Sequence, residues 1–286
     1  MRDGLIISLL SVVPKNHTTR LMGAVSRSGL SRFLIKAFAW RYKINLDECV
    51  GGPADYASLS DFFLRPLLPT ARPTDETPEV LVSPADAKVH TFGRIVDGTF
   101  AQSDTRSGSI ADLVGDDDSR TASAPPMNGA QFEGGHYAVL YLSPQDYHRV
   151  HSPREGSLTR TRYLPGRLWP VFPTATRRID GLFDRNERLI FQVQTDRGLI
   201  AAAMIGAFGV GRMTSPHADI ITNTGNEARD VTQSAPPTIA RAAELGSFGL
   251  GSTVILLLPP GDFTWALTPG MRVRVGQAIG QWGAPL

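Results

Sequence analysis

The sequence predicts an α+β protein that is mainly β, with an antiparallel sandwich or barrel-like catalytic core and an N-terminal amphipathic helical segment. From residue 80 onward, short apolar runs alternate with Gly, Pro, Asn and Asp, which is typical of strands joined by turns. Few helical patterns lie between these runs. The first 50 residues differ, because they combine apolar residues at helical spacing with eight Lys/Arg against three acids.

The predicted helical, membrane-associating segment covers residues 1–68. Its first apolar run, Leu5 to Val13, has nine residues and is followed by Pro14. About 20 apolar residues are needed to span a bilayer, so we expect no transmembrane helix. No small-residue cleavage site follows the run, so we expect no secretory signal and a segment that remains in the mature protein.

Residues 30–43 are predicted to form an amphipathic basic helix. Its apolar residues and its basic residues follow helical spacing on different sides, the apolar set being Leu30, Phe33, Leu34, Ala37 and Phe38 and the basic set Arg32, Lys36 and Lys43. Such a helix either lies on an anionic membrane or packs on the protein's own core with a solvated basic face, and both readings stay open. A second, short helix is expected between Ser58 and Pro66, where Ser58 and Asp61 form a capping box.

Residues 69–286 are predicted to form the β-rich catalytic domain. The expected strands are Val80 to Val82, Lys88 to Phe92, Tyr137 to Leu142, Leu189 to Thr195, Leu199 to Ile205, Val254 to Leu258 and Val273 to Val275. Two stretches with acidic residues and Ala-Pro-Pro, residues 103–129 and 222–237, are expected to be exposed loops.

Composition limits the class of protein. The formal net charge is only +2, which argues against a nucleic-acid surface. Cys49 is the single cysteine, so the chain can form neither an internal disulfide nor a cysteine-based zinc site. No HExxH or comparable spacing is present either, and we assign no metal.

One short segment could carry unusual chemistry. Gly251 and Ser252 precede the apolar run Val254 to Leu258. Glycine at the start of a strand marks a bulge or turn, or a place where the backbone must be closely approached. In the second case the Ser252 hydroxyl could attack the preceding carbonyl, and elimination from the resulting ester would leave a pyruvoyl group at residue 252.

Two other segments hold polar residues that could assist that serine. His148 and His151 lie three residues apart between Pro144 and Pro153, and an irregular segment could bring both side chains together. Asp86 lies in a turn between two expected strands, where it either caps backbone N–H groups or orients a histidine.

Six segments together resemble the phosphatidylserine decarboxylase family, the pyruvoyl-dependent enzymes that make phosphatidylethanolamine. In chain order they are Phe62-Phe63-Leu64-Arg65-Pro66-Leu67, Ser83-Pro84-Ala85-Asp86, residues 141–153, Tyr163-Leu164-Pro165-Gly166, residues 182–188 and Leu250-Gly251-Ser252-Thr253-Val254-Ile255. The sequence departs from the family at Ala87, where a glycine is often seen, and over residues 103–129.

The resemblance implies that the chain cuts itself between Gly251 and Ser252 into a β chain, residues 1–251, and an α chain, residues 252–286. Ser252 would become the covalent pyruvoyl cofactor, which forms a Schiff base with phosphatidylserine. Asp86, His151 and Ser252 would form the charge-relay set for self-cleavage, and His148 would donate a proton during decarboxylation. The expected location is the cytoplasmic side of the cell membrane, as a peripheral protein, and a homodimer of the αβ unit stays open.

Three alternatives remain at this point. The chain could decarboxylate a related serine-headed lipid. It could also be a non-catalytic module, since residues 273–280 resemble a biotinyl/lipoyl hairpin, although no lysine follows Lys88. A Ser-His-Asp hydrolase would use the same residues, but Leu250 and Val254 stand where a nucleophile elbow has glycines.

Overall fold

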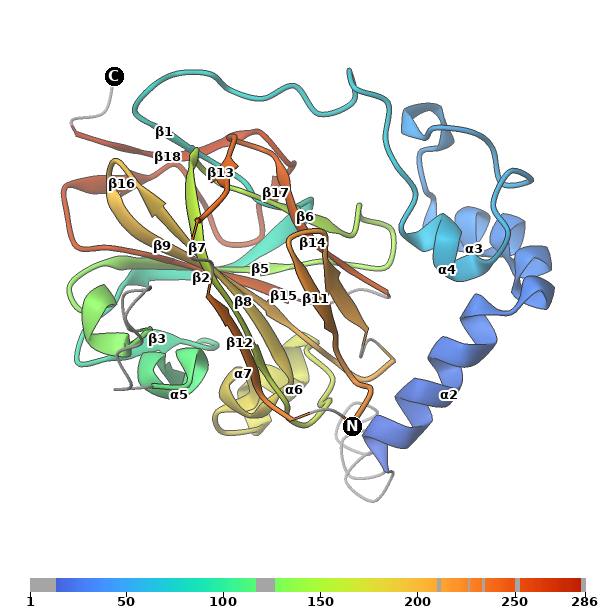
Figure 1. Ribbon diagram of the computed structural model, residues 1–286, viewed down its shortest axis with the longest axis horizontal. Helices are drawn as coiled ribbons and strands as arrows, with labels where there is room; N and C mark the ends of the chain where they lie inside the picture. The colour runs from blue at the N-terminus through green and yellow to red at the C-terminus, as the bar shows by residue number, and fades with distance from the viewer. Residues whose placement is uncertain are drawn as a thin grey trace.

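The computed structural model describes residues 14–116, 127–209, 212–225, 227–232, 235–249 and 253–283. Gly251 and Ser252, the predicted cleavage site, lie outside the described residues, as does the acidic run at residues 116–118 beyond Asp116. Within the described residues, four antiparallel sheets make up the β-rich part, and the N-terminal helices α2, α3 and α4 lie on one side of it (Figure 1).

The largest sheet crosses the molecule and holds most of the core. Its strands run in the order β12 (Arg229–Thr232), β7 (Gly156–Leu164), β8 (Arg188–Thr195), β9 (Gly198–Ile205), β15 (Thr253–Leu258), β5 (His136–Tyr141), β2 (Ala87–Arg94) and β17 (Arg272–Val273), with β13 (Thr238–Ile239) beside β7. Every residue of β15 is buried, so this strand is covered on both faces. That burial explains why the sequence shows a continuous apolar run there rather than an alternating pattern.

A four-stranded sheet packs against this large sheet. Its strands run in the order β11 (Ala218–Ile221), β10 (Met213–Ser215), β14 (Glu244–Phe248) and β6 (Arg149–His151). Gly246 of β14 allows the close approach, because a Cβ there would lie 2.9 Å from the Phe191 ring and 3.0 Å from the Met204 sulfur. The two sheets therefore share one core in a sandwich, as predicted, and they do not close into a barrel.

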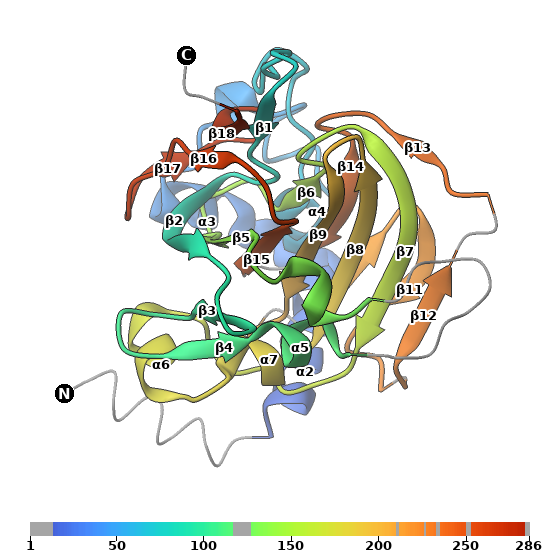
Figure 2. The same cartoon turned by 90° about the vertical axis from the view of Figure 1, so that its left-hand side faces the viewer.

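Smaller elements close the two ends of the sandwich (Figure 2). One end holds a three-stranded sheet of β1 (Val80–Val82), β18 (Ala278–Trp282) and β16 (Phe263–Trp265). The other end holds the β3 (Thr99–Ala101) and β4 (Ser107–Ser109) hairpin together with α5 (Ile110–Val114), α6 (Pro173–Arg178) and α7 (Leu182–Arg185). A short helical turn, η3 (Gly129–Phe132), packs on α5.

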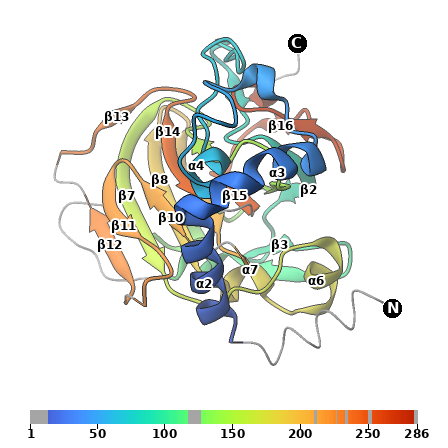
Figure 3. The same ribbon diagram turned by 90° about the vertical axis from the view of Figure 1, so that its right-hand side faces the viewer.

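The N-terminal helices lie together on one side of the sandwich (Figure 3). They are α2 (Lys15–Arg27), η1 (Gly29–Leu34), α3 (Ile35–Tyr42), η2 (Leu46–Glu48) and α4 (Leu59–Phe63). Ile35, Ala39, Ile44 and Phe62 form a small core of their own here. The Arg20 side chain fixes α2 to the β-rich part by donating from Nε to the Asn223 carbonyl over 2.8 Å.

The predicted elements and the structure agree best where apolar runs are long. Each of the seven predicted strands overlaps an observed one, and Ser58 caps α4 by accepting from the Asp61 N–H at 3.2 Å. Residues 30–43 instead form a 3₁₀ turn followed by α3, and the side chains of Leu30, Phe33 and Leu34 are exposed rather than packed. No helix in the described part of the chain is long and apolar enough to cross a membrane.

Both predicted loops were partly wrong. Residues 103–129 include β4 and α5, and Ile110, Leu113 and Val114 are fully buried there. Residues 222–237 include β12, which pairs with β7 from Arg229 to Thr232. An ionic contact helps to explain this second correction, because Asp230 of the exposed strand β12 accepts from the buried Arg162 of β7 over 2.7 Å.

Candidate active site

The two histidines lie on the connection that leaves the central strand β5. Residues 142–148 form this connection, and His151 ends the short strand β6 that follows. The backbone N–H of Phe248, at the end of β14, donates to the His148 carbonyl over 2.9 Å. Strand β15 then begins at Thr253, which pairs with Tyr141 and with Ile205. The predicted cleavage site therefore joins two strand ends that both lie beside the histidine-bearing connection.

His148 is fully buried and proton-free at Nε2. Its Nδ1 lies 2.7 Å from the Asp146 carbonyl, and because a carbonyl only accepts, Nδ1 carries the hydrogen. Burial, aided by the positive charge of Arg65, lowers the pKa of His148 to about 3. The Phe63 ring packs on the imidazole with a centroid distance of 4.0 Å. The Nε2 atom is buried and has no hydrogen-bond partner among the described residues.

His151 has the same arrangement. Its Nδ1 lies 2.7 Å from the Ala242 carbonyl, so Nδ1 again carries the hydrogen, and its buried Nε2 has no described partner. Burial lowers the pKa of His151. Two neutral imidazoles with open lone pairs are proton acceptors.

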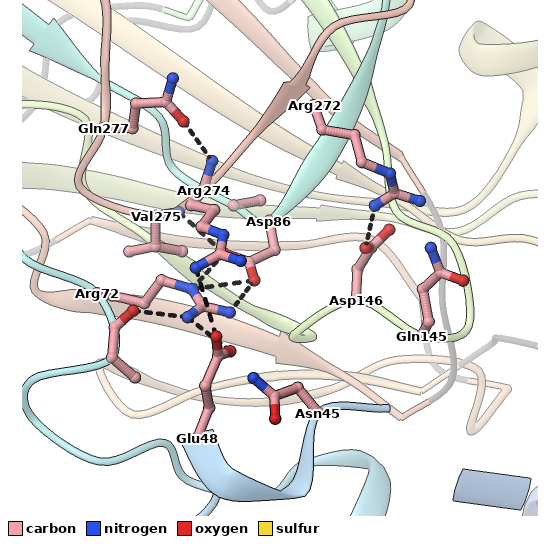
Figure 4. A network of polar contacts seen from close by, with 12 residues as sticks. Asn45, Glu48, Arg72, Asp86, Gln145, Asp146, Arg272, Arg274, Val275 and Gln277 are labelled. Atoms are coloured by element: carbon pink, nitrogen blue, oxygen red, sulfur yellow. Dashed lines mark hydrogen bonds and ion pairs between the residues drawn. The ribbon is translucent and has the colours of Figure 1, made fainter. Parts of the chain in front are cut away.

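Asp86 lies in the turn between β1 and β2. The backbone of this turn contacts the backbone of His151, but the Asp86 side chain forms no hydrogen bond with the His151 ring. The His151 N–H donates to the Pro84 carbonyl over 2.8 Å. The Asp86 carboxylate instead accepts from Arg72, with both oxygens within 3.0 Å of Nε, and from the Val275 N–H at 3.0 Å (Figure 4). The expected bond that would orient His151 is thus absent in this structure, and Ala242 orients the ring instead. The negative charge of Asp86 still acts through space, since it favours the protonated form of His151.

Arg72 and Arg65 are site residues that the sequence reasoning missed. Arg72 also donates to Glu48, at 2.9 Å, so it joins the N-terminal segment to the turn that holds Asp86. Arg65 is only 3 % exposed, and its charge acts on His148. Both arginines precede a proline, but an arginine followed by a proline does not itself indicate burial or an acidic partner.

Arg65 and Arg72 line a cavity of about 300 Å³ between the N-terminal segment and the β-rich part. Asp86, Tyr147 and Arg65 contribute to its wall. The described residues contain no cluster of three or more His, Cys, Asp or Glu that could hold a metal ion. For a cofactor made from residue 252 the fit is better, because two unpartnered imidazole nitrogens and the buried, unpartnered Thr253 hydroxyl lie around the ends of β14 and β15.

Two proton-accepting histidines with buried Nε2 atoms, on an antiparallel β core with a carboxylate and two arginines close by, define a centre for enzymatic acid–base chemistry. Comparisons with known proteins give its family. A family model described as phosphatidylserine decarboxylase matches residues 59–281. The chain belongs to this family.

Full-length relatives support the assignment. The chain is 39 % identical over 289 residues to the phosphatidylserine decarboxylase proenzyme of Anaeromyxobacter sp. (strain K), covering 98 % of this chain and 99 % of that protein. It is 38 % identical over 290 residues to the protein of the same name from Ectopseudomonas mendocina (strain ymp), covering 98 % of this chain and 99 % of that one. The proenzyme from Bordetella pertussis (strain Tohama I) is 36 % identical over 288 residues, with 97 % of this chain and 94 % of that protein covered.

Proposed function

We propose that this chain is a self-processing decarboxylase that converts phosphatidylserine to phosphatidylethanolamine and CO2. It would cleave itself between Gly251 and Ser252 and carry a pyruvoyl group at residue 252. The observation that carries the proposal is the pair of buried, proton-free Nε2 atoms of His148 and His151 beside the strands that this peptide joins. The name of these relatives, proenzyme, agrees with a processed precursor.

In the cleavage step, His151 is the base. Its Nε2 takes the proton of the Ser252 hydroxyl, and the oxygen attacks the Gly251 carbonyl carbon. The amide then becomes an ester, and elimination releases the Gly251 carboxylate and leaves dehydroalanine. Hydrolysis of dehydroalanine releases ammonia and gives the pyruvoyl group. Asp86 contributes by stabilising the imidazolium through space.

In the decarboxylation step, the pyruvoyl ketone supplies an electron sink for the loss of CO2 from the serine head group. His148 begins neutral, because its pKa is far below 7. It therefore takes up a proton before it acts as the donor that the sequence suggested. A neutral His148 first accepts a proton from the substrate ammonium and later returns it to the α-carbon, so its donor role comes second.

Exposed apolar side chains support a peripheral membrane location, which we propose to be the cytoplasmic face of the cell membrane. Leu30, Phe33 and Trp40 are 79 %, 72 % and 82 % exposed on η1 and α3. The inner side of α3 is packed, because Ile35 and Ala39 are buried against Phe62. Basic residues accompany the exposed apolar ones, namely Arg27, Arg32, Lys36, Arg41 and Lys43. An apolar surface with a basic surround suits the interface of an anionic bilayer.

Intact mass of the purified protein tests the chemistry. The wild type is expected to give two chains, with a carbonyl in place of the serine amine at the start of the shorter one, and to release CO2 from phosphatidylserine. The Ser252→Ala variant is expected to stay as one chain without activity. A wild type that remains a single chain yet is folded would rule out the proposed cofactor.

Vesicle sedimentation tests the membrane proposal. The double variant Phe33→Ser/Trp40→Ser should bind anionic vesicles several-fold less than the wild type. Val96→Ser removes a side chain that is 56 % exposed in the β2–β3 connection, and it should bind as the wild type does. Equal binding by all three proteins would refute a membrane role for η1 and α3.

A further inference from the structure

The cavity beside Asp86 contains more positive charge than its own acids balance. Five basic and three acidic side chains line it. Each acid has an arginine partner: Asp86 and Glu48 contact Arg72, and Asp146 accepts from Arg272 at 2.7 Å. Figure 4 shows the two groups of ion pairs, one around Asp86 and one around Asp146. Arg65 and Lys43 line the same cavity, and neither forms an ion pair within the described ranges.

Arg65 is the more informative of these two cations. Its side chain is 3 % exposed, its Nη2 donates to the Gln145 carbonyl at 3.2 Å, and its Nε and Nη1 are buried without a described partner. A guanidinium has five N–H donors, and leaving charged donors unsatisfied in a buried site is costly. An anion with several oxygens would satisfy two of them at once, as phosphate and carboxylate groups do with arginine.

The position of the cavity indicates which anion this is. The cavity includes Tyr147, which precedes His148 in the chain and whose ring centroid lies 5.6 Å from that of His151. Lys43 also lines a second, mostly apolar hollow of about 720 Å³, which Trp40 and Ile44 of the N-terminal segment help to form. A ligand with an anionic group near Arg65 and Lys43 would therefore have apolar surface on one side and the proposed reactive group on the other.

We propose that Arg65 and Lys43 form a binding site for the phosphodiester of a serine-headed phospholipid. This inference rests on the proposed function, because the lipid class comes from it. Arg65 binds the phosphate oxygens from inside the protein and Lys43 binds from the rim. The serine amine, only a few covalent bonds from the phosphate, then lies toward the histidines.

Calorimetric binding to the uncleaved, full-length Ser252→Ala protein tests the site without using activity. The probes are glycerophosphoserine, which is the deacylated head group, and inorganic phosphate. We expect saturable binding of glycerophosphoserine, about tenfold or more weaker after Arg65→Gln and several-fold weaker after Lys43→Gln. Arg178→Gln, an exposed arginine of α6, should bind as the parent does.

Lys43 is exposed, so its variant stays informative if Arg65→Gln fails to fold. Unchanged affinity in both variants would overturn the proposal. Equal affinity for inorganic phosphate and glycerophosphoserine would overturn the assignment to a lipid head group. If the wild type decarboxylates phosphatidylserine while these variants bind normally, only this inference fails. If Ser252→Ala binds the head group but the wild type neither cleaves nor decarboxylates, the proposed function fails and the binding site remains.

Discussion

Arg72 binds the carboxylate of Asp86, with Nε 2.9 Å and 3.0 Å from the two carboxylate oxygens. The side chains are 12 % and 9 % exposed, so little water competes with this contact. Asp86, which the sequence assigned to a charge relay with His151, therefore forms its ion pair with the buried guanidinium of Arg72. It influences His151 by its field rather than by a hydrogen bond.

This relationship predicts strong coupling between Arg72 and Asp86. Removing one partner leaves the other charge buried and unpaired, which costs about 3 kcal/mol. In the Ser252→Ala background, Arg72→Gln and Asp86→Asn should each lower the free energy of unfolding, while the double variant should lose clearly less than their sum. Urea unfolding of the four proteins completes the cycle. Additive losses would mean that the pair contributes no coupling.

The two histidines are predicted to act at different stages. His151→Ala should remain largely uncleaved, as should Asp86→Asn, because the serine hydroxyl is then left without its base or without the charge that supports that base. His148→Ala should cleave but turn over roughly a hundredfold or more slowly, since a positioned acid–base group contributes on that order. Intact mass and CO2 release separate the two stages. Full turnover by cleaved His148→Ala would remove His148 from the mechanism.

Most of the core could be predicted from the sequence, because the strands at its centre are continuously apolar. Strand β15 is the clearest example, since burial on both faces leaves no polar position in it after Thr253. Strand β7 could not be found that way. It contains Arg160 and Arg162, which are buried because Asp230 of β12 pairs with them, and that partner is distant in sequence.

The candidate site was partly predictable, for a different reason. His148, His151 and Asp86 lie in short motifs whose residue types indicate chemistry, and the structure brings their backbones together. Arg65 and Arg72 depend on contacts with residues far along the chain, Gln145 and Asp86. What covers the exposed side of η1 could not be predicted, because helical spacing gives the apolar side without saying whether protein or membrane covers it.

His148 is predicted to make the protein less stable in acid. Its pKa is lowered to about 3 in the folded chain, from an ordinary 6.5, so between these values only the unfolded chain takes up the proton. Its contribution to stability is complete above 6.5 and is lost as pH falls toward 3, by at most about 1.4 kcal/mol for each pH unit. Urea unfolding from pH 7 to pH 4 should show a smaller decrease for His148→Gln than for the parent. His17→Gln, at an exposed position of α2, is the control, and an identical decrease in all three proteins would contradict the buried neutral imidazole.

Glu187 is predicted to have the opposite pH dependence. Its Oε1 accepts from the Tyr163 hydroxyl and the Asn223 N–H, both at 2.6 Å, while the buried Oε2 has no described partner. Burial raises the pKa of Glu187 to about 7, from an ordinary 4.5. The folded chain therefore holds a proton that the unfolded chain has lost between these values. The resulting stability is complete below 4.5 and is lost as pH rises through 7, by at most about 3 kcal/mol.

Glu187→Gln, which keeps the shape and a neutral side chain, should remove most of this loss between pH 5 and pH 8. Glu76→Gln, at an exposed position, is the matched control, and it should lose stability between pH 5 and pH 8 as the parent does. Unfolding in urea at several pH values gives the measurement. Because Glu187 joins β7 to the turn at Asn223, which also binds Arg20 of α2, and because the positive charge of Arg20 favours the ionised carboxylate, α2 should stay bound to the β-rich part when Glu187 ionises. Hydrogen exchange of α2 that becomes faster from pH 5 to pH 8, once corrected for the intrinsic rate, would disprove that link.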